Sequence, residues 1–306
     1  MRNTPELPFP GSGRTAERFR GLAALGRTDL VTARLGEGHA DAMAIRASLR
    51  DASLDETRQT PTDERWGVWA AAPSSVRAEH TSTGWQLTGD RPWCSGAVWC
   101  THALVTAAAE DGTRLFAVRN TAPHAVPLDG TWPAIGMAGS DSRTVRFTAA
   151  PARPVGEPGD YVNRPGFWHG GIGVAACWYG GALGIADTLH AAAGRKDLDP
   201  HGLAHLDAVD AAIAAARAVL FEAAAIIDAD PAAHAHRLAL RVRAVVERSA
   251  TEVLDRAGRM LGAGPLCRDV QHAQRVADLT VYLRQSHAEA DLEQLGRLVA
   301  EAEQPW

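Results

Sequence analysis

The stretch of sequence that decides the fold is TGWQLTGDRPWCSGA, residues 83–97. Apolar and polar residues alternate in its first half, and Gly89-Asp90 interrupts the alternation. This pattern predicts a β-hairpin with Gly89-Asp90 at the turn. Small residues surround Trp93 and leave room for a flat molecule to lie against the backbone. A second glycine-rich stretch, GMAGSDS, occupies residues 136–142.

Short candidate strands surround this stretch between Trp66 and Phe147. Turn-forming Gly, Pro, Asn and Asp residues separate them, which is typical of a small all-β barrel or sandwich. Because the strands do not alternate with helices, a Rossmann βαβ unit is not expected. The expected strands are 67–71, 76–80, 85–87, 103–108, 115–119 and 144–147.

Helical patterns flank the β-rich zone on both sides. Apolar residues recur at helical spacing over 27–45, and Thr28 is the expected N-cap. A polar run at 50–65 reads as a linker. The Ala-rich remainder predicts an antiparallel bundle of four helices, near 167–193, 203–228, 233–261 and 269–302.

The sequence therefore predicts an α+β fold of three regions. Residues 1–62 form an N-terminal helical region, residues 63–155 a central antiparallel β-barrel or sandwich, and residues 156–306 a C-terminal helical bundle. With 306 residues, of which 46% are hydrophobic, the chain can bury a sizeable core.

Composition also limits the kinds of molecule that the protein is expected to bind. The net charge of −5, from 31 basic and 36 acidic residues, provides no basic stripe for nucleic acid. The N-terminus lacks the apolar run of a secretory signal, and no apolar stretch with the length of a membrane span, roughly 18 residues, is expected. A cytoplasmic protein with no nucleic-acid or membrane partner is expected.

The four cysteines show neither C-x-x-C spacing nor a nearby pair of histidines, so buried free thiols are expected rather than a zinc site or disulfides. His201 and His205 have helical i, i+4 spacing, but they fall at an expected loop and helix start. No metal site is therefore predicted.

Four motifs together resemble the acyl-CoA dehydrogenase family. Residues 67–73 resemble the family's first flavin-facing strand, which ends in Thr-Glu-Pro. Residues 85–97 resemble the strand that carries Trp-Ile-Thr-Asn, and residues 136–142 resemble Gly-Met-Arg-Gly-Ser-Asp-Thr. Residues 261–269 resemble the Gly-rich turn and Arg-Asp before the final helices. The likeness covers nearly the whole chain from Gly26 onward and shares the family's order of helical, β and helical regions.

The resemblance implies FAD as the cofactor, held by backbone groups of two adjacent strands and one hydroxyl. Position by position, Val68, Ala70 and Ala71 would meet the pyrimidine side of the flavin. Arg195 stands where the family has an arginine that meets the FAD pyrophosphate.

The same resemblance implies that Trp93, Cys94 and Ser95 meet the flavin ring and its N5 edge. Ser95 keeps the hydroxyl that the family usually supplies from Thr. In the alternative interpretation, Trp85 and Trp93 are aromatic residues of the barrel core and Gly89-Asp90 is an ordinary hairpin turn. The three β-domain motifs, taken together, favour the flavin site.

The family's dehydrogenation requires a carboxylate base, because the α-proton of a thioester must be removed as hydride leaves the β-carbon. Counted from Arg268-Asp269, the usual base position is Ala277. Asp278 is one residue further on and is the candidate base if the start of the helix is rotated, since adjacent helical positions point about 100° apart. Related flavin monooxygenases place a His near here, which makes His272 a candidate acid–base residue.

The resemblance implies an FAD flavoprotein that oxidises an acyl-CoA or related thioester at its α,β-bond. Two alternatives remain: a non-catalytic subunit that completes the flavin site of an intact homologue, and a flavin-dependent monooxygenase. Because a neighbouring subunit completes each FAD site in the family, a homodimer, a homotetramer or a heteromer with a homologous subunit is expected.

Overall fold

The computed structural model describes residues 7–49, 63–71, 75–194 and 198–303. The chain forms two compact units. The helical unit comprises Met1–Ala33, Ile135–Met137 and Trp168–Trp306, and the barrel unit comprises Arg34–Ala134 and Ala138–Phe167. The region boundaries after residues 62 and 155 stay predictions, and most of the predicted linker lies outside the described residues.

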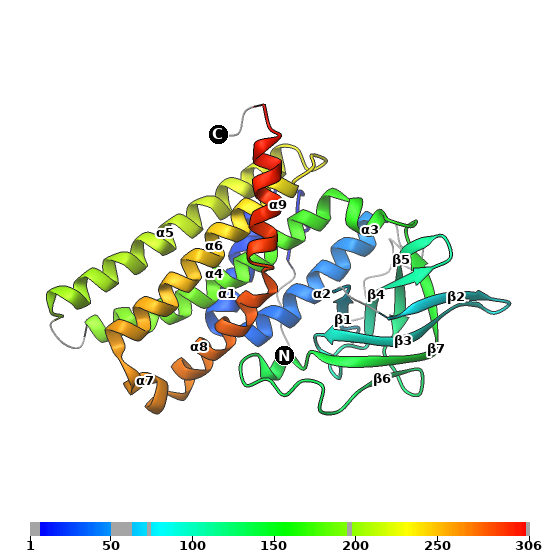
Figure 1. Cartoon of the computed structure of the whole chain (residues 1–306), viewed down its shortest axis with the longest axis horizontal. Helices are drawn as coiled ribbons and strands as arrows, with labels where there is room; N and C mark the ends of the chain where they lie inside the picture. Colours follow the sequence, from blue (N-terminus) through cyan, green and yellow to red (C-terminus); the bar gives the residue numbers. More distant parts are fainter. Residues whose placement is uncertain (1–6, 50–62, 72–74, 195–197, 304–306) are drawn as a thin grey trace. The chain divides into compact units, whose positions relative to one another are not determined.

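The barrel unit is built on a ring of paired strands (Figure 1). The order β4, β2, β3, β7 and β5 closes because β5 pairs with β4, while β1 adds to β4 and β6 adds to β7. The predicted α+β fold with a central barrel is confirmed, although β1 and β2 both run parallel to β4 rather than antiparallel. The strands are β1 (Trp66–Trp69), β2 (Arg77–Thr81), β3 (Gly84–Cys94), β4 (His102–Ala109), β5 (Gly112–Arg119), β6 (Ala125–Pro127) and β7 (Arg143–Val155).

The predicted hairpin turn at Gly89-Asp90 is wrong, because β3 runs through it without a break. The hairpin instead joins β2 to β3, where Thr81 pairs with Gly84. At Gly89 the register with β7 shifts, and the residue has a φ of 125°. A Cβ there would lie 2.5 Å from the Ser75 carbonyl oxygen. Gly89 therefore permits a bulge and a close approach of two backbone segments. Both of these features require a glycine, as a turn does, so the sequence does not distinguish them.

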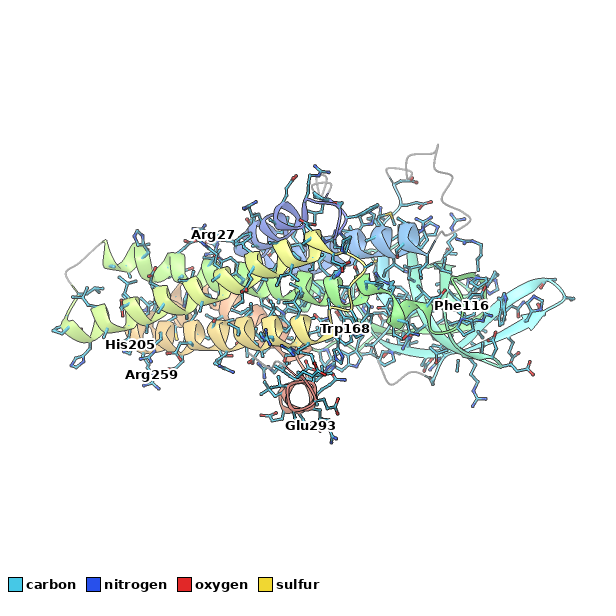
Figure 2. The ribbon with its side chains drawn as sticks, turned by 90° about the horizontal axis from the view of Figure 1, so that it is seen from above. Arg27, Phe116, Trp168, His205, Arg259 and Glu293 are labelled. Carbon is cyan, nitrogen blue, oxygen red and sulfur yellow. The ribbon has the colours of Figure 1, made fainter. Side chains whose placement is uncertain are left out.

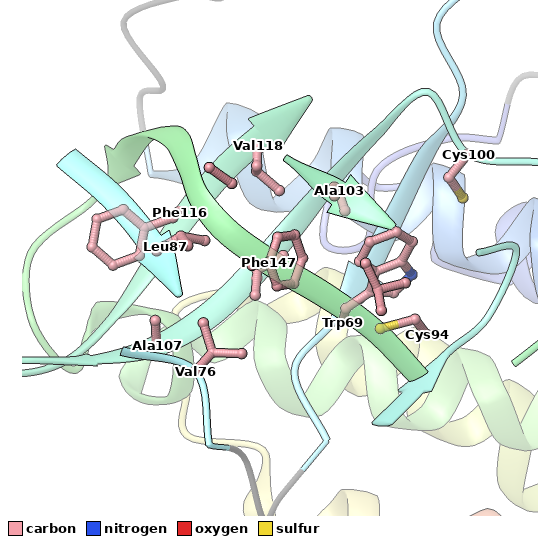
Figure 3. Close-up of a cluster of buried hydrophobic side chains, with 14 of the residues drawn as sticks. Trp69, Val76, Leu87, Cys94, Cys100, Ala103, Ala107, Phe116, Val118 and Phe147 are labelled. Carbon is pink, nitrogen blue, oxygen red and sulfur yellow. The ribbon is translucent and has the colours of Figure 1, made fainter. Parts of the chain in front are cut away.

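The interior of the barrel is filled by large apolar side chains that alternate with outward-facing residues along the strands (Figure 3). Trp69, Phe116 and Phe147 are each at most 1% exposed. Three cysteines are buried, but Cys267 is exposed, so the prediction of buried thiols was wrong there. Burial raises the pKa of Cys100 to about 12, which keeps this thiol protonated at neutral pH.

Helices make up the rest of the described chain. Thr28 is the last residue of the first helix and not an N-cap; its hydroxyl donates to the Ala24 carbonyl. Asp29 takes the capping role, because its carboxylate accepts the Thr32 N–H at 2.6 Å. The helices are α1 (Thr15–Thr28), α2 (Leu30–Ser48), α3 (Asp160–Asn163), α4 (Pro165–Ala193), α5 (Pro200–Ala229), α6 (His236–Leu261), α7 (Ala263–Arg268), α8 (Val270–Tyr282) and α9 (Glu289–Ala300).

In the helical unit, α1 packs against helices that are far away in the sequence. A Cβ at Gly180 of α4 would lie 2.1 Å from the Ala23 carbonyl oxygen, so α1 and α4 touch backbone to backbone. The Thr15 N–H and hydroxyl both donate to the Asp228 carboxylate of α5, at 2.9 and 2.6 Å. These contacts fasten α1 to the C-terminal helices.

The fourth predicted helix, 269–302, is broken in the structure. Helix α8 ends at Tyr282 and α9 begins at Glu289, with Ala288 at a φ of 47° between them. Figure 2 shows α9 end-on, with Glu293 labelled, so it runs across α6 rather than along it. Because neither Gly nor Pro marks the break, helix propensity alone predicted one continuous helix.

Within the described chain, α4 is long and apolar enough to cross a membrane by length and composition. However, 78% of its most apolar window is buried inside the protein. Core helices meet the same criterion, so this feature is weak evidence for a membrane span.

Candidate functional site

The two segments predicted to hold a flavin ring lie side by side in the barrel unit. The Trp69 indole N–H donates to the Ser95 carbonyl at 3.0 Å. The buried guanidinium of Arg91 donates to the Ala71 carbonyl at 2.7 Å and to the Thr106 carbonyl at 2.5 Å. Val68 and Ser95 line the same small pocket. Residues from the end of β1 and the end of β3 thus form one surface.

The side chains of this surface differ in what they can offer a ligand. Trp93 has a φ of 63° and is 56% exposed, and its ring meets Trp132 edge-on at 6.0 Å. Trp85, by contrast, packs against Phe116, with 5.3 Å between the ring centroids. This agrees with the alternative interpretation of Trp85 as an aromatic residue of the barrel core. Ala70 is half-buried and Ala71 is exposed. The exposed indole of Trp93 offers a flat apolar face of the kind a ring can stack on.

Cys94 points the other way, because its side chain is fully buried in the barrel interior. Burial raises the pKa of this thiol, which stays protonated. Only the backbone of Cys94 can therefore take part in the predicted site.

Ser95 is the end of a chain of hydroxyl groups. Its Oγ lies 2.9 Å from Ser142 Oγ, which in turn lies 2.9 Å from Ser140 Oγ. The Gly96 N–H donates to the Ser140 carbonyl at 2.7 Å. The two glycine-rich motifs of the sequence, 83–97 and 136–142, therefore meet at Ser95.

Arg34 is the residue that the sequence analysis missed. Its Nε donates to Ser95 Oγ at 3.2 Å, and its terminal nitrogen lies 2.6 Å from the Glu37 carboxylate. The side chains of Arg34 and Glu37 are only 14% and 5% exposed, so this is a buried ion pair. No local motif marks Arg34, because its contact with Ser95 spans 61 positions. The small pocket beside it is lined by Arg34, Leu35, Gly38, Trp66, Gly67, Val68, Ser95 and Cys100.

Asp278 lies on α8 in the helical unit and is 3% exposed. Its Oδ1 accepts the Met137 backbone N–H at 2.5 Å and the Gln274 side-chain amide at 2.8 Å. A Cβ at Gly136 would lie 2.1 Å from the Ala277 carbonyl oxygen. Segment Ile135–Met137 therefore covers α8 at both Ala277 and Asp278, and Asp278 holds that segment in place.

His272 lies one and a half turns earlier on α8 and is 3% exposed. Its backbone N–H donates to the Asp269 carboxylate, which caps the helix. In the described part of the chain, its Nδ1 has no hydrogen-bond partner. Burial lowers the pKa of His272; Asp269 opposes that shift and Arg275 adds to it. The imidazole is therefore neutral at pH 7.

The remaining predicted site residue, Arg195, lies outside the described residues. Among the residues that the structure does describe, no group of three or more His, Cys, Asp and Glu side chains gathers as a metal site would require.

The chain was compared with protein families, curated proteins and solved structures, and only the solved structures match. No protein-family model matches the chain, and no curated protein matches it by sequence. The structure is similar to dibenzothiophene monooxygenase TdsC from a Paenibacillus species in complex with FMN and indole, with a TM-score of 0.80, 17% identity, and 92% of this chain and 82% of that chain covered.

Two further solved structures are equally extensive matches. Methanesulfinate monooxygenase MsuC from Pseudomonas fluorescens gives a TM-score of 0.78 at 17% identity and covers 95% of this chain and 85% of its own. The steroid ACAD Tcur3481-Tcur3483 gives 0.74 at 20% identity and covers 92% and 81%. These identities are low, so the likeness is one of fold. The chain has the acyl-CoA dehydrogenase-like fold.

Proposed function

We propose that this protein is a flavin-dependent oxidoreductase whose flavin ring lies on the surface formed by Val68–Ala71 and Trp93–Ser95. The observation that carries the proposal is the meeting of these two segments, which are more than 20 positions apart in the sequence, at the Trp69 bond to Ser95. Several solved structures with the same fold contain FMN in their own sites, including those of TdsC and KijD3.

The residues on this surface fit a flavin. Trp93 offers an exposed aromatic face, the methyl groups of Ala70 and Ala71 leave the backbone accessible, and Ser95 offers a hydroxyl. Because an arginine Nε–H can only donate, Ser95 Oγ accepts from Arg34. The Ser95 proton is then available to Ser142 or to a ligand atom. A bound flavin would supply hydride or electron transfer at its N5 edge.

Of the reactions that this fold supports, we favour oxygen-dependent monooxygenation over thioester dehydrogenation. Ala277 has no carboxylate, and Oδ1 of Asp278 is engaged by Met137 beneath a segment that covers α8. Monooxygenation requires no carboxylate at this position. His272 stays the acid–base candidate that the sequence resemblance implies for this reaction.

The first test is a visible absorption spectrum of the purified protein, before and after addition of FMN or FAD. The proposal expects flavin bands, and it expects Ser95→Ala to weaken flavin binding about tenfold, since one hydrogen bond is worth about 1–1.5 kcal/mol. Ser82→Ala, in the exposed β2–β3 turn, is the matched control and should bind like the wild type. Protein that stays colourless with both flavins would refute the proposal.

The reaction class needs its own test. Under monooxygenation with added reduced flavin as the two-electron donor, one labelled atom of O₂ would enter an aromatic or sulfur-containing substrate and the other would leave as water. His272→Gln would slow this step without releasing flavin. Under dehydrogenation, an acyl-CoA bleaches the flavin without oxygen, and Asp278→Asn abolishes the bleaching. Only the first pattern supports the favoured reaction.

A second candidate is a non-catalytic subunit in a heteromer with an intact homologue. The same absence of an accessible carboxylate on α8 favours it. Its signature is a flavin complex that forms only when the protein is produced together with such a homologue, and size-exclusion chromatography of the yellow fraction would then contain both chains.

A further inference from the structure

The barrel unit contains a second cavity, of about 270 Å³, that the proposed flavin site does not use. It lies on the face of the sheet against which α2 packs, beside the cluster of Ala42, Ile45 and Trp66. The side chains that give this cavity its chemistry are Arg46, Glu64, Trp66, His102, Arg119 and Arg153.

Strand register explains why these side chains converge. His102 at the start of β4 is directly opposite Arg119 at the end of β5. Arg153 of β7 is opposite Ala117, two residues before Arg119. Because residues two apart in a strand share a face, Arg119, His102 and Arg153 all point to the same side of the sheet.

The floor of the cavity is rigid. Arg46 is 4% exposed, and its guanidinium lies 4.0 Å from the Trp66 ring centroid. His102 stacks on Trp66 at 4.8 Å. Glu64 accepts the Trp66 indole N–H at 2.8 Å and lies 3.9 Å from Arg46. Arg46 is thus fixed in position by a cation–π contact and a carboxylate, and ligand binding need not immobilise it.

The described lining of the cavity is mainly cationic. Of the residues that the structure describes, three guanidinium groups and the carboxylate of Glu64 line it. Among the described residues, Arg119 makes no ion pair, and it is exposed at the rim. Placing arginines close together on one face of a sheet costs free energy through like-charge repulsion, and an anion between them would remove that cost.

We propose that this cavity binds a phosphate group, either inorganic phosphate or a small phosphomonoester. Guanidinium groups bind phosphate oxygens in pairs, and His102 adds a ring nitrogen that can donate. The volume is several times the roughly 30 Å³ of one water and just below the roughly 300 Å³ of the smallest drug-sized pockets. The ligand is accordingly small, and a whole dinucleotide is too large.

Isothermal titration calorimetry of the full chain, in phosphate-free buffer, tests the proposal with inorganic phosphate and AMP as probes. Saturable binding of one anion per chain is expected. Arg119→Gln and Arg153→Gln should each weaken it about tenfold or more, the effect of losing one charge-assisted hydrogen bond. Arg146→Gln is the matched control, because Arg146 is an exposed arginine of β7 that pairs with Asp90 outside the cavity.

The titrations distinguish the two possible ligands and can also refute the proposal. Tighter binding of phosphate than of AMP identifies the free anion as ligand, and the reverse identifies a phosphomonoester. Absence of saturable binding up to about ten millimolar, or equal affinities in the wild type and both cavity variants, would overturn the proposal. Since Arg119 is exposed, its substitution should leave the fold intact, which circular dichroism verifies. None of these readouts depends on a flavin.

Discussion

The ion pair of Arg34 and Glu37 illustrates how a single residue can carry both stability and function. Removing Arg34 leaves the Glu37 carboxylate buried without this partner, so Arg34→Gln should lower the free energy of unfolding by about 3–5 kcal/mol. Urea denaturation measures this loss. The double variant Arg34→Gln with Glu37→Gln should recover part of it, because neither charge of this pair is then left without the other.

Arg259, an arginine in an exposed ion pair, is the matched control for that experiment. Arg259 pairs with Asp255 on the surface of α6, with both side chains about half exposed. Arg259→Gln should cost less than about 1 kcal/mol. Equal losses at Arg34 and Arg259 would contradict the view that the Arg34 pair is buried and structural.

Asp278 is predicted to act as a clamp on segment Ile135–Met137. Asp278→Ala leaves the Met137 N–H without its acceptor and should cost about 2–3 kcal/mol of unfolding free energy. Asp278→Asn keeps an acceptor oxygen and should cost less. If Asp278→Ala were as stable as the wild type while losing all turnover, Asp278 would be the base of the reaction and not a clamp.

At the scale of residues, the sequence predicted contacts between segments that carry motifs. It missed contacts between residues that are far apart in the sequence and carry no motif. The nearness of Val68 to Ser95 followed from two recognisable motifs. Arg34 was missed because one arginine on a helix carries no signature of a partner 61 residues away. Thr28 and Asp29 are both good capping residues, and which of them caps depends on where the preceding helix ends.

At the scale of elements, the contact of α1 with α4 depends on the missing side chain of Gly180. Gly180→Ala would place a methyl group 2.1 Å from the Ala23 carbonyl oxygen, so the helices must separate, at a cost of about 1–3 kcal/mol. Gly258 is the control, because it is a helical glycine of α6 with open space around it. Gly258→Ala should stabilise the protein by up to about 1 kcal/mol. Thermal unfolding of both variants compares them, and a stabilising Gly180→Ala would refute the close packing.

Regular elements were predictable where one periodicity continues unbroken. The candidate strands and the long helices α4 to α6 all stand near their expected positions. The short β6 was missed, since three residues are too few to show alternation. The break between α8 and α9 has no glycine or proline to announce it. A bulge and a turn both need a glycine at Gly89, so sequence pattern alone did not tell them apart.

For the whole molecule, acid should weaken the folded state through its buried histidines. Burial lowers the pKa of His39, His102 and His272 below the ordinary value of 6.5. As pH falls, the unfolded chain takes up these protons first, so unfolding is favoured. Stability is therefore expected to be complete above about pH 7 and to fall as pH passes below 6.5.

Urea midpoints measured at pH 7.5 and 5.5 check this dependence. His272→Gln removes one of the buried imidazoles and should flatten the pH dependence, whereas His80→Gln, at an exposed position of β2, should leave it unchanged. A protein that is more stable at pH 5.5 than at 7.5 would contradict the prediction.

The bonds between Thr15 and Asp228 join positions 213 apart, and the barrel strands lie between them in the chain. During synthesis, α1 is made before α4 and α5, and it completes its packing only after both of these helices have followed. The barrel, whose strands are complete by Val155, can fold in that interval. Contacts of such long range are slow to form, and α1 therefore stays accessible to chaperones and proteases until α5 has been made.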